Sequence, residues 1–99
     1  MLTLAIEHRA DSQRFQAVVE GEVCVADYRL HDGVMAILHT QVAPRLTGRG
    51  IAGALVQAAL DHAKAQGLKV NPVCSYAATY MRRRPETLAL LPDPEQRQI

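Results

Sequence analysis

The sequence predicts an α/β fold built on a mixed β-sheet. Four strand-like runs fill the first 43 residues, a helical period follows, and a short apolar run comes after the helix. A helix between two strands permits a parallel crossover, so we expect an antiparallel N-terminal meander, a β-α-β crossover and C-terminal helices. With 99 residues, 48% of them hydrophobic, the chain has the size of one domain. We place this domain at residues 1–92 and expect residues 93–99 to form a flexible tail.

The four N-terminal runs predict strands joined by tight turns. In the first three runs apolar side chains alternate with polar or small ones, the period of a strand with one buried face. The fourth run is more continuously apolar, which suits a more central strand. The runs lie at residues 2–9, 15–19, 23–30 and 34–43. Turn-forming residues with glycine or aspartate separate the runs, and residues 9–14 leave room only for a turn. Short spacers of this kind are typical of antiparallel hairpins.

The period then changes to that of a helix. Apolar residues recur on one face over residues 51–66, and Gly67 stands where a helix commonly ends. A short run at 68–74 predicts the fifth strand. Ser75 is our candidate cap for a second helix over 76–83, and Pro85 suits the start of a last helical piece.

Composition and charge narrow the class of protein. The net charge is only +1, which argues against a dedicated nucleic-acid binder, but residues 45–84 hold seven basic residues against Asp61 alone. This segment is expected either to meet a negative ligand or to form a solvated basic face. No apolar run is long enough for a membrane span, and the N-terminus lacks a signal-peptide pattern. Cys24 and Cys74 stand 50 positions apart and form no metal-ligand spacing, so we expect a reduced cytoplasmic protein without a metal site.

A glycine-rich turn between the fourth strand and the long helix is the most informative segment. Gly48, Gly50 and Gly53 allow a sharp turn and a close backbone approach to a ligand. The first amides of a helix lack partners, and Arg45 and Arg49 add positive charge, so the turn predicts a phosphate cradle. Neither GxxxxGK[ST] nor the dinucleotide-binding pattern fits. The alternative is an ordinary strand–helix turn whose glycines serve packing.

Residues 42–56 (VAPRLTGRGIAGALV) resemble the acetyl-CoA-binding motif of the GNAT N-acetyltransferase superfamily, Q/R-x-x-G-x-G/A. The whole chain is similar to a branch of short, stand-alone, single-domain GNAT-like proteins. The runs shared with that branch are HTQV at 39–42, PVCSY at 72–76, and a tyrosine followed by RPE within 80–86. One departure stands out, because Thr47 occupies the leading Gln/Arg position of the motif.

The resemblance implies acetyl-CoA as co-substrate and acetyl transfer from its thioester to an amine by direct attack. It places the CoA-binding residues at Thr40, Gln41, Val42, Arg45, Thr47, Gly48, Arg49, Gly50, Ile51, Ala52 and Gly53, with Arg82 or Arg83 as further phosphate contacts.

Four residues are candidates for the chemistry that the resemblance implies. Tyr80, with Tyr76 as second choice, is the candidate proton donor to the leaving thiolate. Cys74 is a candidate acetyl acceptor or proton donor, and His39 a candidate base. For each there is a purely structural alternative: a tyrosine at the rim, a small buried cysteine or a hydrogen-bonded strand histidine.

Two other functions stay open. The chain leaves little room to shape an acceptor pocket, which suits a peptide, protein or small-molecule amine, or a non-catalytic acetyl-CoA-binding module. A small nucleic-acid-binding protein would use Arg45, Arg49 and the run at 82–84, although the near-zero net charge and scarce aromatics argue against it. We expect no membrane partner.

Overall fold

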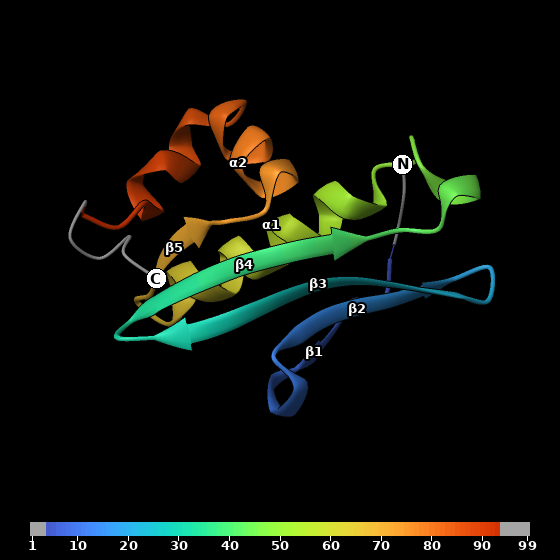
Figure 1. Cartoon of the computed structure of the whole chain (residues 1–99), viewed down its shortest axis with the longest axis horizontal. Helices are drawn as coiled ribbons and strands as arrows, with labels where there is room; N and C mark the ends of the chain where they lie inside the picture. Colours follow the sequence, from blue (N-terminus) through green and yellow to red (C-terminus); the bar gives the residue numbers. More distant parts are fainter. Residues whose placement is uncertain (1–3, 94–99) are drawn as a thin grey trace.

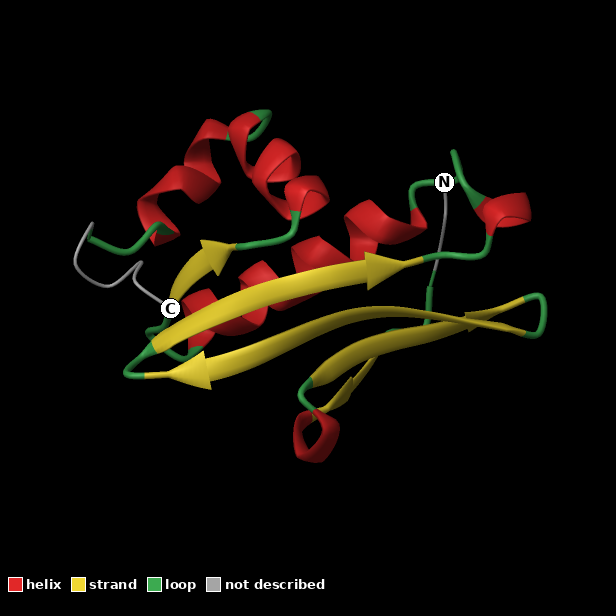
Figure 2. Cartoon of the chain, in the orientation of Figure 1, coloured by secondary structure: helices red, strands yellow, loops and turns green. Residues whose placement is uncertain are grey.

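The computed structural model describes residues 4–93 and contains one five-stranded sheet in the order β1-β2-β3-β4-β5. The first four strands are antiparallel, and β5 runs parallel to β4 (Figures 1 and 2). The elements are β1 (Glu7–Arg9), β2 (Arg14–Val19), β3 (Glu22–His31), β4 (Val34–Gln41), α1 (Ile51–Ala65), β5 (Lys69–Pro72) and α2 (Ser75–Arg82). This arrangement confirms the predicted fold class, including the β-α-β crossover from β4 through α1 to β5.

Helix α1 supplies one side of the core. It packs across β2, β3, β4 and β5 with one apolar face. The buried residues of that face are Ile51, Leu55, Val56, Ala59, Leu60 and Ala63. The helix ends as predicted, because Gly67 follows it with a φ of +71°, a conformation that glycine adopts without strain. Burial of this face fixes the start of α1 against β4, where the glycine-rich turn lies.

Strand β4 carries an irregularity that positions the site. Ile37 lies opposite Tyr28 and His39 lies opposite Asp27, so Leu38 is one extra residue without a partner on β3. Such a bulge shifts the alternation of side chains along the strand. As a result Thr40 points toward α1, like the core residue Ile37, whereas His39 reaches Asp27 on the other face of the sheet.

Beyond the bulge, β4 loses its parallel neighbour. Strand β5 pairs with β4 only as far as Pro72, which lies opposite Ile37. The Cys74 amide adds one further bond, donating to the Ile37 carbonyl at 2.9 Å. From Leu38 onward, this edge of β4 has no strand partner within residues 4–93. A free strand edge of this kind offers N–H and C=O groups to an extended ligand.

Some local predictions were wrong. Among the described residues, the expected strand at 2–9 pairs only over Glu7–Arg9, although Leu4 and Ile6 still pack against the core. Ser75 is the first residue of α2 rather than its cap: Cys74 is the cap, and no side chain bonds the helix start. The piece after Pro85 is a 3₁₀ helix (Pro85–Leu90).

The boundary at residue 92 stays a prediction, and residues 94–99 of the expected tail lie outside the described part. Within residues 4–93, no helix combines the length and apolar character that a membrane crossing requires.

Candidate functional site

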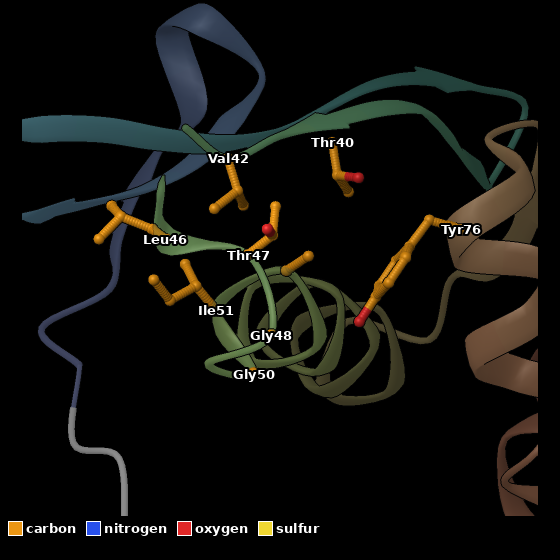
Figure 3. Close-up of a pocket in the computed structure, with 9 residues that line it drawn as sticks. Thr40, Val42, Leu46, Thr47, Gly48, Gly50, Ile51 and Tyr76 are labelled. Carbon is orange, nitrogen blue, oxygen red and sulfur yellow. The ribbon is translucent and has the colours of Figure 1, made fainter. Parts of the chain in front are cut away.

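A pocket of about 420 Å³ lies between the free edge of β4 and the start of α1 (Figure 3). The residues that line it are Thr40, Val42, Leu46, Thr47, Gly48, Gly50, Ile51, Ala52 and Tyr76. Seven of these belong to the CoA-binding set predicted from the sequence, so the fold gathers most of that set around one cavity. Gln41, Arg45, Arg49 and Gly53 do not line this pocket.

The glycine-rich turn presents unpaired backbone donors. Gly48 and Gly50 have φ values of +85° and +82°, and Gly50 precedes α1 as its cap without any side-chain hydrogen bond. The Thr47 hydroxyl donates to the Pro44 carbonyl at 2.8 Å, so the residue at the leading motif position closes the turn instead of reaching outward. Within residues 4–93, no acceptor bonds the amides of Gly48, Arg49, Gly50, Ile51, Ala52 or Gly53. Consecutive free amides at a helix start favour an anion.

The two arginines of the turn already have partners. Arg45 bonds Glu20 at 2.9 Å and Glu22 at 3.2 Å, and Arg49 bonds Glu20 as well. Both carboxylates belong to the β2–β3 hairpin. Hydrogen bonds from Arg49 and Arg45 hold the pKa of Glu20 below its usual range. The predicted phosphate-binding arginines are therefore engaged in exposed ion pairs, which tie the turn to the hairpin.

A second pocket of about 430 Å³ adjoins the first and shares Gly50 and Tyr76 with it. Its other lining residues come from α1, α2 and the segment after α2: Gly53, Ala54, Gln57, Thr79, Tyr80, Arg83 and Arg84. A Cβ built on Gly53 would lie 3.2 Å from the Tyr76 hydroxyl and 3.3 Å from Cε2 of Tyr80. Glycine at this position thus lets the two helices approach closely, which is the packing role the sequence left open.

Tyr80 belongs to this second pocket and is absent from the lining of the first. Its hydroxyl donates to Gln57 Oε1 at 2.5 Å, and the Arg84 guanidinium lies 3.7 Å from the ring centroid. Burial raises the pKa of Tyr80, and nearby Arg84 partly opposes that shift. Tyr80 is thus a protonated, anchored side chain. No pattern in the sequence indicates Gln57 and Arg84 as its partners.

Tyr76 reaches the first pocket. Its ring extends from α2 toward the start of α1 (Figure 3), and the side chain is partly exposed. Cys74 is partly buried at the α2 cap, with Sγ 4.0 Å from the Thr40 hydroxyl oxygen, and it lines neither of these two pockets. The geometry therefore favours Tyr76 over Tyr80 as the tyrosine closest to a ligand beside Thr40.

His39 lies away from both pockets. It projects from the other face of the sheet, where Nε2 lies 3.0 Å from Asp27 Oδ2. Asp27 accepts hydrogen bonds from Arg14, at 2.7 Å and 3.2 Å. No sequence pattern indicates this cluster, because its residues stand on three different strands and their alignment depends on strand register.

The comparisons with known proteins identify the family. A family model described as GCN5-related N-acetyl-transferase matches residues 14–90. The chain belongs to this family.

The mouse protein NATD1 is 29% identical over 86 residues, which cover 83% of this chain and 77% of NATD1. An NMR structure of a GCN5-like protein from Staphylococcus aureus matches 99% of this chain and 97% of its own, with a TM-score of 0.73 and 24% identity. At that identity the likeness bears on the fold alone. The resemblance to the GNAT superfamily is confirmed, and acetyl-CoA is the co-substrate that this family generally uses.

Proposed function

We propose that this GNAT protein is an acetyl-CoA-dependent N-acetyltransferase that transfers the acetyl group to an amine by direct attack. The observation that carries the proposal is the set of unpaired amides over residues 48–53. Four of these residues line a pocket that also meets the free edge of β4 at Thr40. An anion site beside an exposed strand edge suits a diphosphate joined to a pantetheine arm.

The residues present fit this co-substrate. A Cβ added at Gly48 would meet nothing within 4 Å, so the turn borders open space of the kind a diphosphate needs. The amides of residues 48–53 would hold the diphosphate, and the backbone of residues 40–42 would pair with the pantetheine arm. Arg83, which lines the adjoining pocket, is placed to attract a further phosphate.

Acetyl-CoA supplies the acetyl thioester when bound, and the chain supplies orientation and proton transfer. Unpaired amides on the β4 edge are placed to donate to the oxygen that gains negative charge during attack. Tyr76, which lines the pocket together with Thr40, is our candidate to protonate the departing thiolate.

The acceptor side of the protein is open. Between β1 and β2 there is only a short 3₁₀ turn (Ala10–Ser12), which is too short to enclose an acceptor. A peptide, protein or small-molecule amine therefore fits. We also propose a reducing compartment such as the cytoplasm, because Cys24 and Cys74 are both free thiols.

Calorimetric titration of acetyl-CoA into the purified protein tests the proposal. We expect saturable binding by the native protein and none by Gly50→Glu, whose carboxylate would lie beside the diphosphate amides. The variant should keep its circular dichroism spectrum, since the left-handed backbone at Gly50 costs a side chain only about 1–2 kcal/mol.

Absence of binding by the native protein at millimolar acetyl-CoA would contradict the proposal. Thiol release with a panel of amines then separates the enzyme from the alternative, a binding module, which would bind acetyl-CoA and release no thiol with any acceptor.

A further inference from the structure

A row of three polar side chains crosses the sheet on the face opposite α1. Arg14, Asp27 and His39 lie directly opposite one another on β2, β3 and β4. The Asp27 carboxylate accepts hydrogen bonds from Arg14 at 2.7 Å and 3.2 Å, and its Oδ2 lies 3.0 Å from His39 Nε2. Only 17% of the Asp27 side chain is exposed, whereas 55% of His39 is exposed. Asp27 thus holds one imidazole nitrogen in place and leaves the rest of the ring accessible.

The contact with Asp27 orients the imidazole. Histidine has two ring nitrogens, and each can carry a proton or a lone pair. Because Nε2 lies 3.0 Å from Asp27 Oδ2, Nδ1 is the nitrogen left for an incoming group, and it bonds no other group within residues 4–93. A carboxylate that orients a histidine in this way prepares the second nitrogen to accept a proton.

The position of His39 relates this row to the proposed acetyl site. Consecutive strand residues project to opposite faces, and the bulge at Leu38 places Thr40 on the α1 face and His39 on the other. Both residues lie beyond Ile37, the last residue of β4 that pairs with β5, so no neighbouring strand covers this edge of β4 within residues 4–93. A cavity of about 270 Å³ lies in front of His39, and its other lining residues are Ser12, Gln13, Arg14, Asp27, Tyr28, Arg29 and Leu38. This cavity and the first pocket thus lie on opposite faces of β4, at the adjacent residues His39 and Thr40.

We propose that His39 is the base that takes the proton of the acceptor amine, that Asp27 is its positioning residue, and that the acceptor enters through this cavity. The inference rests on the proposed acetyl transfer. In that reaction the amine nitrogen bonds to the acetyl carbon as the carbon–sulfur bond breaks. The proton lost by the amine passes to His39 Nδ1 and then to solvent, and Tyr76 protonates the thiolate. The charged groups that face His39 are Asp27 from β3 and, around the cavity, Arg14 from β2 and Arg29 from β3.

The chain offers a matched control. His31 and Asp32 form a second histidine–carboxylate contact, 3.1 Å long and highly exposed, at the β3–β4 turn. Neither residue lines the pockets described above. His31→Ala and Asp32→Asn therefore repeat the chemical changes of His39→Ala and Asp27→Asn away from the site.

The test measures acetyl-CoA affinity and amine acetylation for all four variants. We expect kcat to fall about 100-fold or more in His39→Ala, the range for loss of a general base. Asp27→Asn should lower kcat about tenfold or more with KM nearly unchanged. Acetyl-CoA affinity should stay within about twofold in both variants, and the control variants should match the native protein. Added imidazole should restore part of the activity of His39→Ala, which a purely structural histidine would not allow.

The outcomes separate this inference from the function on which it rests. If the native protein does not bind acetyl-CoA, both fail. If it binds acetyl-CoA but acetylates no amine, the base assignment is overturned while the binding site stands. If it acetylates amines and either His39→Ala or Asp27→Asn keeps the native kcat, or imidazole fails to restore His39→Ala, the inference is overturned while the proposed function stands.

Discussion

Replacement of Gly48 by alanine is the sharpest test of the diphosphate cradle. Gly48 has a φ of +85°, and a Cβ there would meet no atom within 4 Å in the free protein. Alanine therefore leaves the packing unchanged and costs only the left-handed backbone strain, about 1–2 kcal/mol. For a domain of this size, each kcal/mol lowers Tm by about 4–8 °C.

Binding should suffer more than stability. The new methyl group would occupy space that the diphosphate needs beside the free amides. Displacement of one charge-assisted hydrogen bond costs about 1.5–3 kcal/mol, which corresponds to a loss of affinity of roughly 10- to 150-fold. Calorimetry with acetyl-CoA measures the loss, and thermal unfolding measures the strain.

Gly33→Ala is the matched control. Gly33 has a φ of +76° and equally open surroundings, but it lies in the β3–β4 turn away from the pocket. The two variants should lose similar stability, and only Gly48→Ala should lose affinity. Equal acetyl-CoA affinities for Gly48→Ala and Gly33→Ala would refute the assignment of the diphosphate to this turn.

Three further predictions address other parts of the site and the core. Tyr76→Phe should lower kcat about 100-fold and keep the acetyl-CoA affinity, as expected for loss of a proton donor, whereas Tyr80→Phe should mainly lower Tm. If thiol-release assays instead show the large loss of kcat in Tyr80→Phe, Tyr80 is the proton donor. Glu20→Gln should raise acetyl-CoA affinity by about two- to fivefold in low salt, because the carboxylate no longer competes with the ligand for Arg45 and Arg49. Weaker binding in calorimetry would show instead that these ion pairs order the glycine-rich turn. Burial, and to a lesser extent the nearby His62, lowers the pKa of His8 in the folded protein. The free energy of unfolding should therefore fall as the pH drops below about 6.5, the pKa of histidine in the unfolded chain. His8→Gln should weaken this pH dependence of Tm in thermal scans.

The fold and the position of the proposed anion site could be predicted from the sequence because both depend on local patterns. Alternating residues mark strands, a 3.6-residue period marks α1, and the glycines over 48–53 mark a turn into a helix. Seven of the eleven predicted CoA-binding residues line one pocket for the same reason: they are contiguous or nearly so in the chain.

What the sequence did not reveal depends on strand register. The pairing of Asp27 with His39 requires the bulge at Leu38, and a single inserted residue changes which face a side chain occupies. The ion pairs of Arg45 with Glu20 join segments 25 positions apart, and no periodicity signals such a contact. Long-range polar partners of this kind become visible only once the strands are aligned.

An NMR titration of the ¹⁵N-labelled protein with acetyl-CoA tests the main conclusion most directly. We predict that the amides of residues 48–53 show the largest shift changes at saturation and that residues 40–42 on the β4 edge follow them. Saturable binding that leaves the amides of residues 48–53 unshifted would contradict the account.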